Sequence, residues 1–231
     1  MITLSLYTNC TSFNSNNSNL ISTTFNSFIN TFSLDYVNEI FVFIDPQPNT
    51  KNKELYYKEI SNYFNKYKTD FRNIFIHFTK GLADGYLLSI NKSKNDYIFQ
   101  LEHDWTFNKD LIKHNITELI DSLKYNNIYY FRFNKRKTEV KLSDTYLNEK
   151  IYNNITFSET PSISNNPHII DKNYYNKYVK EFINPDSKGS KGIEEILQKN
   201  KLKIGNIYGS INYPATINHI DGRNKNISKI K

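Results

Sequence analysis

The first 107 residues alternate short apolar runs with longer amphipathic ones, and this alternation constrains the fold more than any other feature. The short runs are rich in β-branched and aromatic residues and predict strands at Ile2–Thr8, Ile40–Ile44, Asn73–Phe78 and Asp96–Leu101. Between them, apolar residues recur at helical spacing in Leu20–Phe32, Leu55–Tyr67 and Leu82–Asn91. This strand and helix alternation predicts an α/β fold with parallel strands.

The alternation weakens after Phe107. Helical spacing predicts a helix over Leu111–Leu123, and an aromatic run predicts a strand over Ile128–Phe133. The polar stretch Lys135–Asn154 is expected to contain a long loop. Because no internal repeat or linker divides the 231 residues, we expect a single domain over residues 1–231.

Charge and composition narrow the classes of partner and site. The formal net charge of +7 favours an anionic partner, which could be a nucleotide diphosphate, a nucleic acid or a peripheral membrane surface. Cys10 is the single cysteine, so the chain has no internal disulfide and no zinc cluster built on cysteines. No apolar run approaches the length of a bilayer span, and no basic leader precedes the first strand. We therefore expect a soluble, cytoplasmic protein without a transmembrane segment.

Three acidic residues follow expected strands, at the edge where open α/β sheets bind ligands. Asp45 follows the second strand, and the segment DYIFQLEHDWTF, residues 96–107, places Glu102 and Asp104 after the fourth. Carboxylates there could hold a divalent cation against a diphosphate. The alternative is an acidic cap for a helix that begins near Asn108.

The segment at residues 96–107 resembles the Asp-x-Asp region of GT-A glycosyltransferases, in particular family 2-like enzymes with an Asp/Glu-x-Asp-Trp variant. Residues 80–95 also resemble that family, in which such a helix leads into the metal-binding strand. The resemblance implies a GT-A-type, Rossmann-like three-layer sandwich with a mostly parallel central sheet. It implies a nucleotide-binding half at residues 1–107 and an acceptor-binding half at residues 108–231.

The resemblance also implies residue roles in the nucleotide-binding half. The residues expected to contact the nucleotide sugar are Thr8, Thr11, Asp45, Asp84 and Glu102. Glu102 stands where the family commonly has Asp, so it is expected to bind the metal through water or to contact the sugar. Strand-end capping remains an alternative for the two threonines, and a turn before Pro46 remains one for Asp45.

A metal site and a leaving-group contact are implied as well. Asp104 is the leading ligand for Mn²⁺ or Mg²⁺, and the segment at residues 218–223 resembles a terminal loop that supplies His219 as a second ligand. Arg223 would neutralise the departing diphosphate. A lone histidine is often structural, so a structural role for His219 stays open.

Acceptor and catalytic residues are implied in three further places. Glu195, with its neighbour Glu194, takes the position of the usual catalytic base at the start of a helix, although acids are also common in a first helical turn without catalysis. Trp105 would line the acceptor sugar or simply pack in the core. The segment at residues 160–169 resembles the acceptor side of the pocket and contributes Asn166 and His168.

The expected function is metal-dependent transfer of a sugar from a nucleoside-diphosphate sugar to a glycan or other hydroxyl acceptor, with inversion. A nucleotidyltransferase is the nearest enzymatic alternative, but such enzymes usually have a Gly-rich loop after the first strand, and residues 9–13 contain no glycine. A non-catalytic nucleic-acid-binding module would fit the charge and the many aromatic residues. It would leave the acidic end of the fourth strand unexplained, and we expect no nucleic-acid partner.

Overall fold

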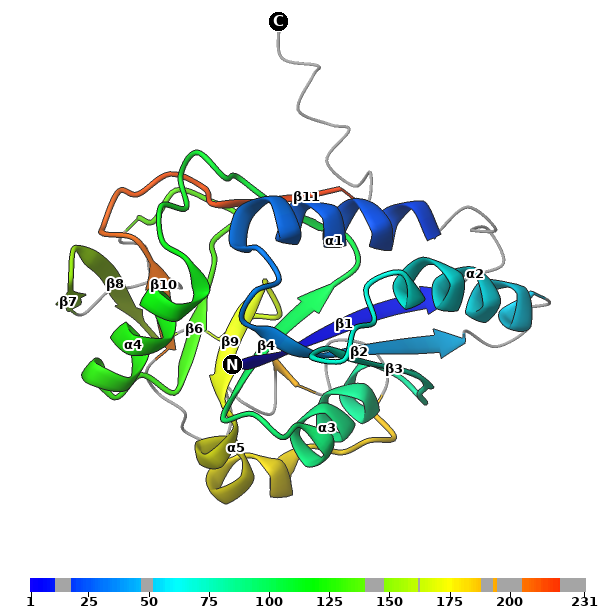
Figure 1. Cartoon of the computed structure of the whole chain (residues 1–231). Helices are drawn as coiled ribbons and strands as arrows, with labels where there is room; N and C mark the ends of the chain where they lie inside the picture. The colour runs from blue at the N-terminus through cyan, green and yellow to red at the C-terminus, as the bar shows by residue number, and fades with distance from the viewer. Residues whose placement is uncertain are drawn as a thin grey trace, which may run out of the picture.

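The computed structural model describes residues 1–10, 18–46, 52–139, 148–161, 163–187, 193–194 and 205–220. Its centre is a nine-stranded sheet with the strand order β3-β2-β1-β4-β9-β6-β10-β8-β7 (Figure 1). Helices cover both faces of this sheet, which confirms the predicted three-layer α/β sandwich.

One half of the sheet is purely parallel and comes from the alternating first part of the chain. It contains β1 (Ile2–Cys10), β2 (Val37–Pro46), β3 (Asn73–Phe78) and β4 (Tyr97–Glu102). The strands β1 and β3 begin at the predicted residue, and β2 and β4 begin within three residues of it. The apolar runs of β1, β2 and β4 are buried on both faces, as parallel strands covered by helices must be.

The other half is mixed. Its strands are β6 (Tyr130–Arg132), β7 (Glu149–Tyr152), β8 (Ile155–Thr160), β9 (His168–Asp171) and β10 (Gly205–Tyr208). The strand β9 is antiparallel to both β4 and β6, whereas β10 is parallel to β6. Among the described strands of the nine-stranded sheet, only β8 and β9 run against the common direction. The sheet is therefore mostly parallel, as expected.

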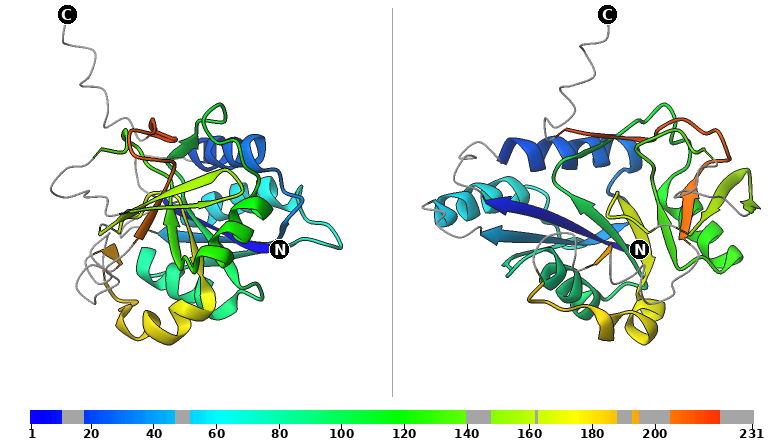
Figure 2. Two further views of the ribbon diagram at one scale, coloured as in Figure 1. Left: turned by 90° about the vertical axis from the view of Figure 1, so that its left-hand side faces the viewer. Right: turned by 180° about the vertical axis from the view of Figure 1, so that it is seen from behind.

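The helices form two layers with separate cores. On one face lie α1 (Ser18–Phe32), α2 (Lys53–Asn65) and α4 (Ile116–Asn126), and on the other lie α3 (Leu82–Lys92) and α5 (Lys172–Tyr178) (Figures 1 and 2). Phenylalanine and isoleucine side chains fill the larger core, and tyrosines contribute strongly to the smaller one. None of the described helices is both long enough and apolar enough to cross a bilayer.

The region after β4 corrects two predictions. The residues Trp105–Phe107 form a short strand, β5, which pairs antiparallel with β11 (Ile217–His219) beside α1 (Figure 1). The next helix begins at Ile116 rather than at Leu111 or Asn108, because Asn115 and Glu118 form a capping box there. Asp104 therefore lies in a turn between two strands and does not cap a helix.

The polar stretch Lys135–Asn154 also contains a strand. This strand is β7, and a tight turn joins it to β8, in which Asn153 and Asn154 have φ of 45° and 66°. Positive φ at both central residues is what a two-residue hairpin needs, and asparagine tolerates it well. The pair Asn153-Asn154 is a turn signal, but the neighbouring residues are also polar, so the sequence does not distinguish this turn from a loop.

Gly209, directly after β10, has a backbone conformation and a close neighbour that leave no room for a side chain. Its φ of 94° disfavours L side chains, and a Cβ added there would lie 2.4 Å from Cγ of Tyr213. Gly209 N donates to Thr156 O at 2.8 Å, and Ser158 Oγ donates to Gly209 O at 2.8 Å, so this backbone has little room to relax.

We predict that Gly209→Ala lowers the free energy of unfolding by about 1–3 kcal/mol, because it combines backbone strain with overpacking. Urea denaturation followed by circular dichroism measures the change. Ser210→Ala serves as the neighbouring control and should stay within about 0.5 kcal/mol of the wild type. Equal stability of the two variants would contradict this description of the turn.

Candidate functional site

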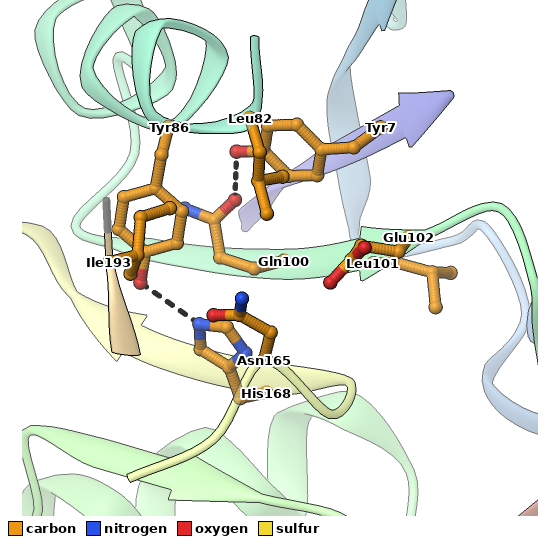
Figure 3. Close-up of a pocket in the computed structure, with 9 residues that line it drawn as sticks. All are labelled: Tyr7, Leu82, Tyr86, Gln100, Leu101, Glu102, Asn165, His168 and Ile193. Atoms are coloured by element: carbon orange, nitrogen blue, oxygen red, sulfur yellow. Dashed lines mark hydrogen bonds between the residues drawn. The ribbon is translucent and has the colours of Figure 1, made fainter. Parts of the chain in front are cut away.

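A pocket opens at the carboxyl ends of β1 and β4, where the two parts of the chain meet (Figure 3). The pocket is narrow, because only about 10 Å³ inside it is open to the centre of a water molecule. Its walls come from β1, α3, β4, β9 and the segments before and after them: Tyr7, Leu82, Tyr86, Gln100, Leu101, Glu102, Asn165, His168 and Ile193. This is the edge at which α/β sheets bind ligands.

His168 on β9 is hydrogen-bonded to α3 in the first part of the chain and to the loop before β9 in the second part. Its Nδ1 lies 2.7 Å from the backbone oxygen of Asn166, and its Nε2 lies 2.9 Å from the hydroxyl of Tyr86 on α3. A carbonyl oxygen can only accept, so Nδ1 carries the hydrogen. Burial lowers the pKa of His168 to about 4, with a smaller contribution from the guanidinium of Arg132. The ring is therefore neutral near pH 7.

A second hydrogen-bonded set lies on the β1 side of the pocket. The hydroxyl of Tyr7 donates to the side-chain oxygen of Gln100 (Figure 3). The amide nitrogen of Gln100 donates to Ser89 Oγ at 3.3 Å. The rings of Tyr7 and Tyr86 stack at 6.3 Å with an angle of 21° between their planes. The pocket wall is thus held in place by internal contacts.

Glu102 and Asp104 lie on either side of His103, and the structure places them in different surroundings. Glu102 ends β4 and lines the pocket. Asp104 follows in the turn, where its Oδ2 lies 2.9 Å from Nε2 of His219. Both members of this Asp104–His219 pair are largely buried, at 9% and 17% exposure of their side chains.

The pairing of β5 with β11 is what brings His219 to Asp104. His219 is in register with Trp105, and their ring centroids are 4.4 Å apart. Ile220 N donates to Asp104 O at 2.8 Å, and Thr24 Oγ1 donates to His103 O at 2.5 Å. These contacts anchor the turn to both α1 and the segment that follows β11.

His103 is the third ionisable group in this region. Burial lowers the pKa of His103, the charge of Asp104 opposes this shift, and His219 adds to it. Its Nδ1 lies 3.3 Å from Tyr7 O. The lowered pKa keeps His103 largely neutral at pH 7, so the carboxylate of Asp104 is not offset by a charge on that ring.

The Asp104–His219 pair fits a divalent cation in its chemistry. A carboxylate and an imidazole are accepted ligands of Mn²⁺, and donor atoms of neighbouring octahedral ligands at about 2.1 Å from a metal lie about 3 Å apart. The observed 2.9 Å matches that spacing. The described residues contain no group of three or more such ligands, so phosphate oxygens and water would have to complete the coordination.

The other residues expected on the nucleotide side lie in three separate places. The hydroxyl of buried Thr8 contacts that of Tyr56 on α2. Asp45 is partly exposed near the end of β2, in register with Asn9 on β1. Asp84 accepts a hydrogen bond from Lys80 N at 3.0 Å at the start of α3. The structure does not test their predicted roles.

The residues expected on the acceptor side are mostly engaged with the protein. Glu194 accepts from Asn165 N at 2.6 Å, which places this carboxylate beside a pocket-lining loop. Asn166 is 3% exposed and donates to Phe133 O at 3.2 Å. Trp105 is 5% exposed and belongs to the larger core. Three expected site residues lie outside the described residues: Thr11, Glu195 and Arg223.

Sequence patterns do not select Tyr86 or Gln100, which line the pocket together with Tyr7. Tyr7 and Gln100 lie inside predicted strands, where alternate side chains face a helix layer, so their position follows from the strand pattern. Tyr86 carries no sequence signal, because only its hydrogen bond to His168 on β9 brings it to the site.

The fold is similar to that of S. aureus TarS. In complex with UDP-GlcNAc, TarS residues 1–349 match 100% of this chain with a TM-score of 0.58 and 10% identity, and this chain covers 61% of that one. The complex with UDP matches 94% at a TM-score of 0.53 and 12% identity, over 59% of that chain. A longer TarS structure matches at a TM-score of 0.52 and 13% identity, over 36% of its length.

The chain therefore has a GT-A-type fold and spans about three-fifths of the length of TarS residues 1–349. No protein-family model and no curated protein sequence matches it.

The buried, neutral His168 predicts a pH-dependent stability. The unfolded chain takes up a proton near pH 6.5, whereas the folded chain does so only near pH 4. The contribution is complete above pH 6.5 and is lost as the pH falls toward 4, up to on the order of 3 kcal/mol. Urea denaturation at several pH values measures it. His168→Gln does not titrate and should show a shallower slope, so equal slopes would contradict the prediction.

Proposed function

We propose that this chain transfers a sugar from a nucleoside-diphosphate sugar to a hydroxyl acceptor in a metal-dependent reaction. The observation that carries the proposal is the Asp104–His219 pair, which lies at the carboxyl edge of the sheet next to the Glu102 pocket. The GT-A-type fold supports it, since TarS has a similar fold and its structures contain UDP-GlcNAc or UDP.

Asp104 and His219 would hold Mn²⁺ or Mg²⁺, and the bound cation would supply positive charge for the diphosphate leaving group. The chain itself holds these two ligands in place through the β5–β11 pairing and the backbone contact from Ile220. Arg223 would add a second positive charge. Preorganised charge of this kind favours a transition state in which negative charge develops on the nucleotide.

Deprotonation of the acceptor hydroxyl would fall to Glu195 or Glu194. A general base must lie within hydrogen-bond reach of the proton that it removes. Glu194 is held at the pocket loop by Asn165 N, and its neighbour Ile193 lines the pocket, which supports a base in this part of the chain. A base on the acceptor side of the sugar implies inversion at the anomeric carbon. Trp105, Asn166 and His168 would support the acceptor side by packing.

Metal-dependent nucleotide binding tests the proposal. Isothermal titration with UDP, GDP and dTDP sugars should show binding in Mn²⁺ that EDTA abolishes. Asp104→Asn keeps the shape of the side chain but loses its charge, so it should weaken this binding at least tenfold. His219→Gln should weaken it by a similar factor.

Asp121→Asn provides the matched control, because it makes the same chemical change on an exposed face of α4. It should bind like the wild type. The proposal fails if none of the nucleotides binds, or if Asp104→Asn retains full metal-dependent binding.

The two glutamates can be separated by kinetics. Glu195→Gln should lower the rate of nucleotide release from the donor by about 10²–10⁴-fold and leave the Kd of the nucleotide unchanged, because a base acts on the acceptor. Glu194→Gln should have the smaller effect, since its carboxylate already accepts from Asn165 N. Wild-type rates in both variants would exclude this pair as the base.

A further inference from the structure

The strand β3 forms one edge of the nine-stranded sheet and has no neighbour on its outer side among the described strands (Figure 1). In a parallel pair, every second residue of a strand bonds to the same neighbour. Thr79 N, just after β3, donates to Ile44 O of β2 at 2.9 Å. Ile74, Ile76 and Phe78 therefore direct their backbone N–H and C=O groups away from β2. None of the described residues forms a hydrogen bond with these outward groups.

The composition of β3 gives it none of the usual protection of an exposed edge. Natural proteins shield such strands with charged residues, proline or bulges. The strand β7, at the opposite edge of the sheet, has Glu149 and Lys150 among its four residues. The six residues of β3 include no lysine, acid or proline, and they pair with β2 without a register shift. Phe75 and Phe78 remain 37% and 39% exposed. The edge is therefore open to a further strand.

Charge does not oppose the approach of a second copy at this edge, although the whole chain has a net charge of +7. The helix α2 flanks β3 on one face, where the ring centroids of Tyr57 and Phe78 are 5.2 Å apart. This helix has two lysines and two glutamates, so its formal charge is zero. Burial lowers the pKa of His77, and the charge of Lys92 lowers it as well, so β3 is uncharged near pH 7.

We propose that two copies of this chain form a twofold-symmetric dimer through antiparallel pairing of their β3 strands. The axis passes beside Ile76, so this residue faces its own copy. Ile74 of one copy then faces Phe78 of the other, and Phe75 faces His77. In this register the outward N–H groups of each strand meet the outward carbonyl groups of the other. Every facing pair is apolar or aromatic, so the strand is complementary to itself, which selects a second copy as the occupant. This inference goes beyond the proposed function and does not depend on it.

Sedimentation equilibrium of the full chain tests the dimer. Between about 1 and 200 µM the apparent mass should rise from 27.3 kDa toward twice that value. Phe75→Lys brings a charge into the buried contact, so the Kd of the dimer should rise at least tenfold. Tyr125→Lys makes a similar change at an exposed aromatic residue of α4 and should dimerise like the wild type. A wild type that stays monomeric throughout overturns the proposal, and so does equal dimerisation of the two variants.

A disulfide cross-link tests the register. In a Cys10→Ser background, Ile76→Cys places two thiols at facing positions, where Cα atoms about 5.5 Å apart allow a disulfide. Ile74→Cys is the matched control, because the strand register separates its two copies by about 14 Å. Oxidation should cross-link Ile76→Cys at least tenfold more than Ile74→Cys. Equal cross-linking of the two variants, or none in either, overturns the proposal. If circular dichroism shows that Phe75→Lys does not fold, the cross-links decide.

Discussion

The candidate site depends on the antiparallel pairing of β5 with β11. This pairing places His219, from the far end of the described chain, within 2.9 Å of Asp104 in the turn after β4. Contacts between α1 and β5 and between Trp105 and His219 hold the small sheet in place. Two short strands therefore unite residues that are more than 100 positions apart, and the proposed metal site would not exist without them.

The two acidic residues at the end of β4 lie in different surroundings, although only one position separates them. Glu102 lines the pocket, and Asp104 belongs to the pair with His219. The neutral rings of His103 and His168 lie near these groups, and burial keeps both in the uncharged form. Neither ring therefore offsets the charge of the carboxylates.

The parallel half of the fold was predictable because its signals are local. Each buried strand is a short apolar run, and each helix between them has clear periodicity. Asp104 and His219 were also chosen as partners, through resemblance to GT-A enzymes rather than through spacing. The predicted helix start at Leu111 is wrong, because the capping box of Asn115 and Glu118 starts α4 at Ile116. The apolar Leu111 and Ile112 extend the helical pattern without being part of the helix.

Other features depend on contacts between distant residues, which no local pattern reveals. The bond between Tyr86 and His168 joins α3, on one face of the sheet, to β9 within the sheet. The burial of Trp105 follows from the β5–β11 pairing, which is only three residues long on each strand. Strands this short carry a weak sequence signal. The residues next to Asp104 in the sequence therefore do not predict which side chains surround it in the fold.

The central claim is that one histidine and one carboxylate of this chain hold a divalent cation. Electron spin echo spectroscopy of Mn²⁺ bound in the presence of UDP detects nitrogen ligands directly. The account predicts ¹⁴N modulation from a single imidazole that disappears in His219→Gln. Bound Mn²⁺ without that modulation, or modulation that persists in the variant, would contradict it.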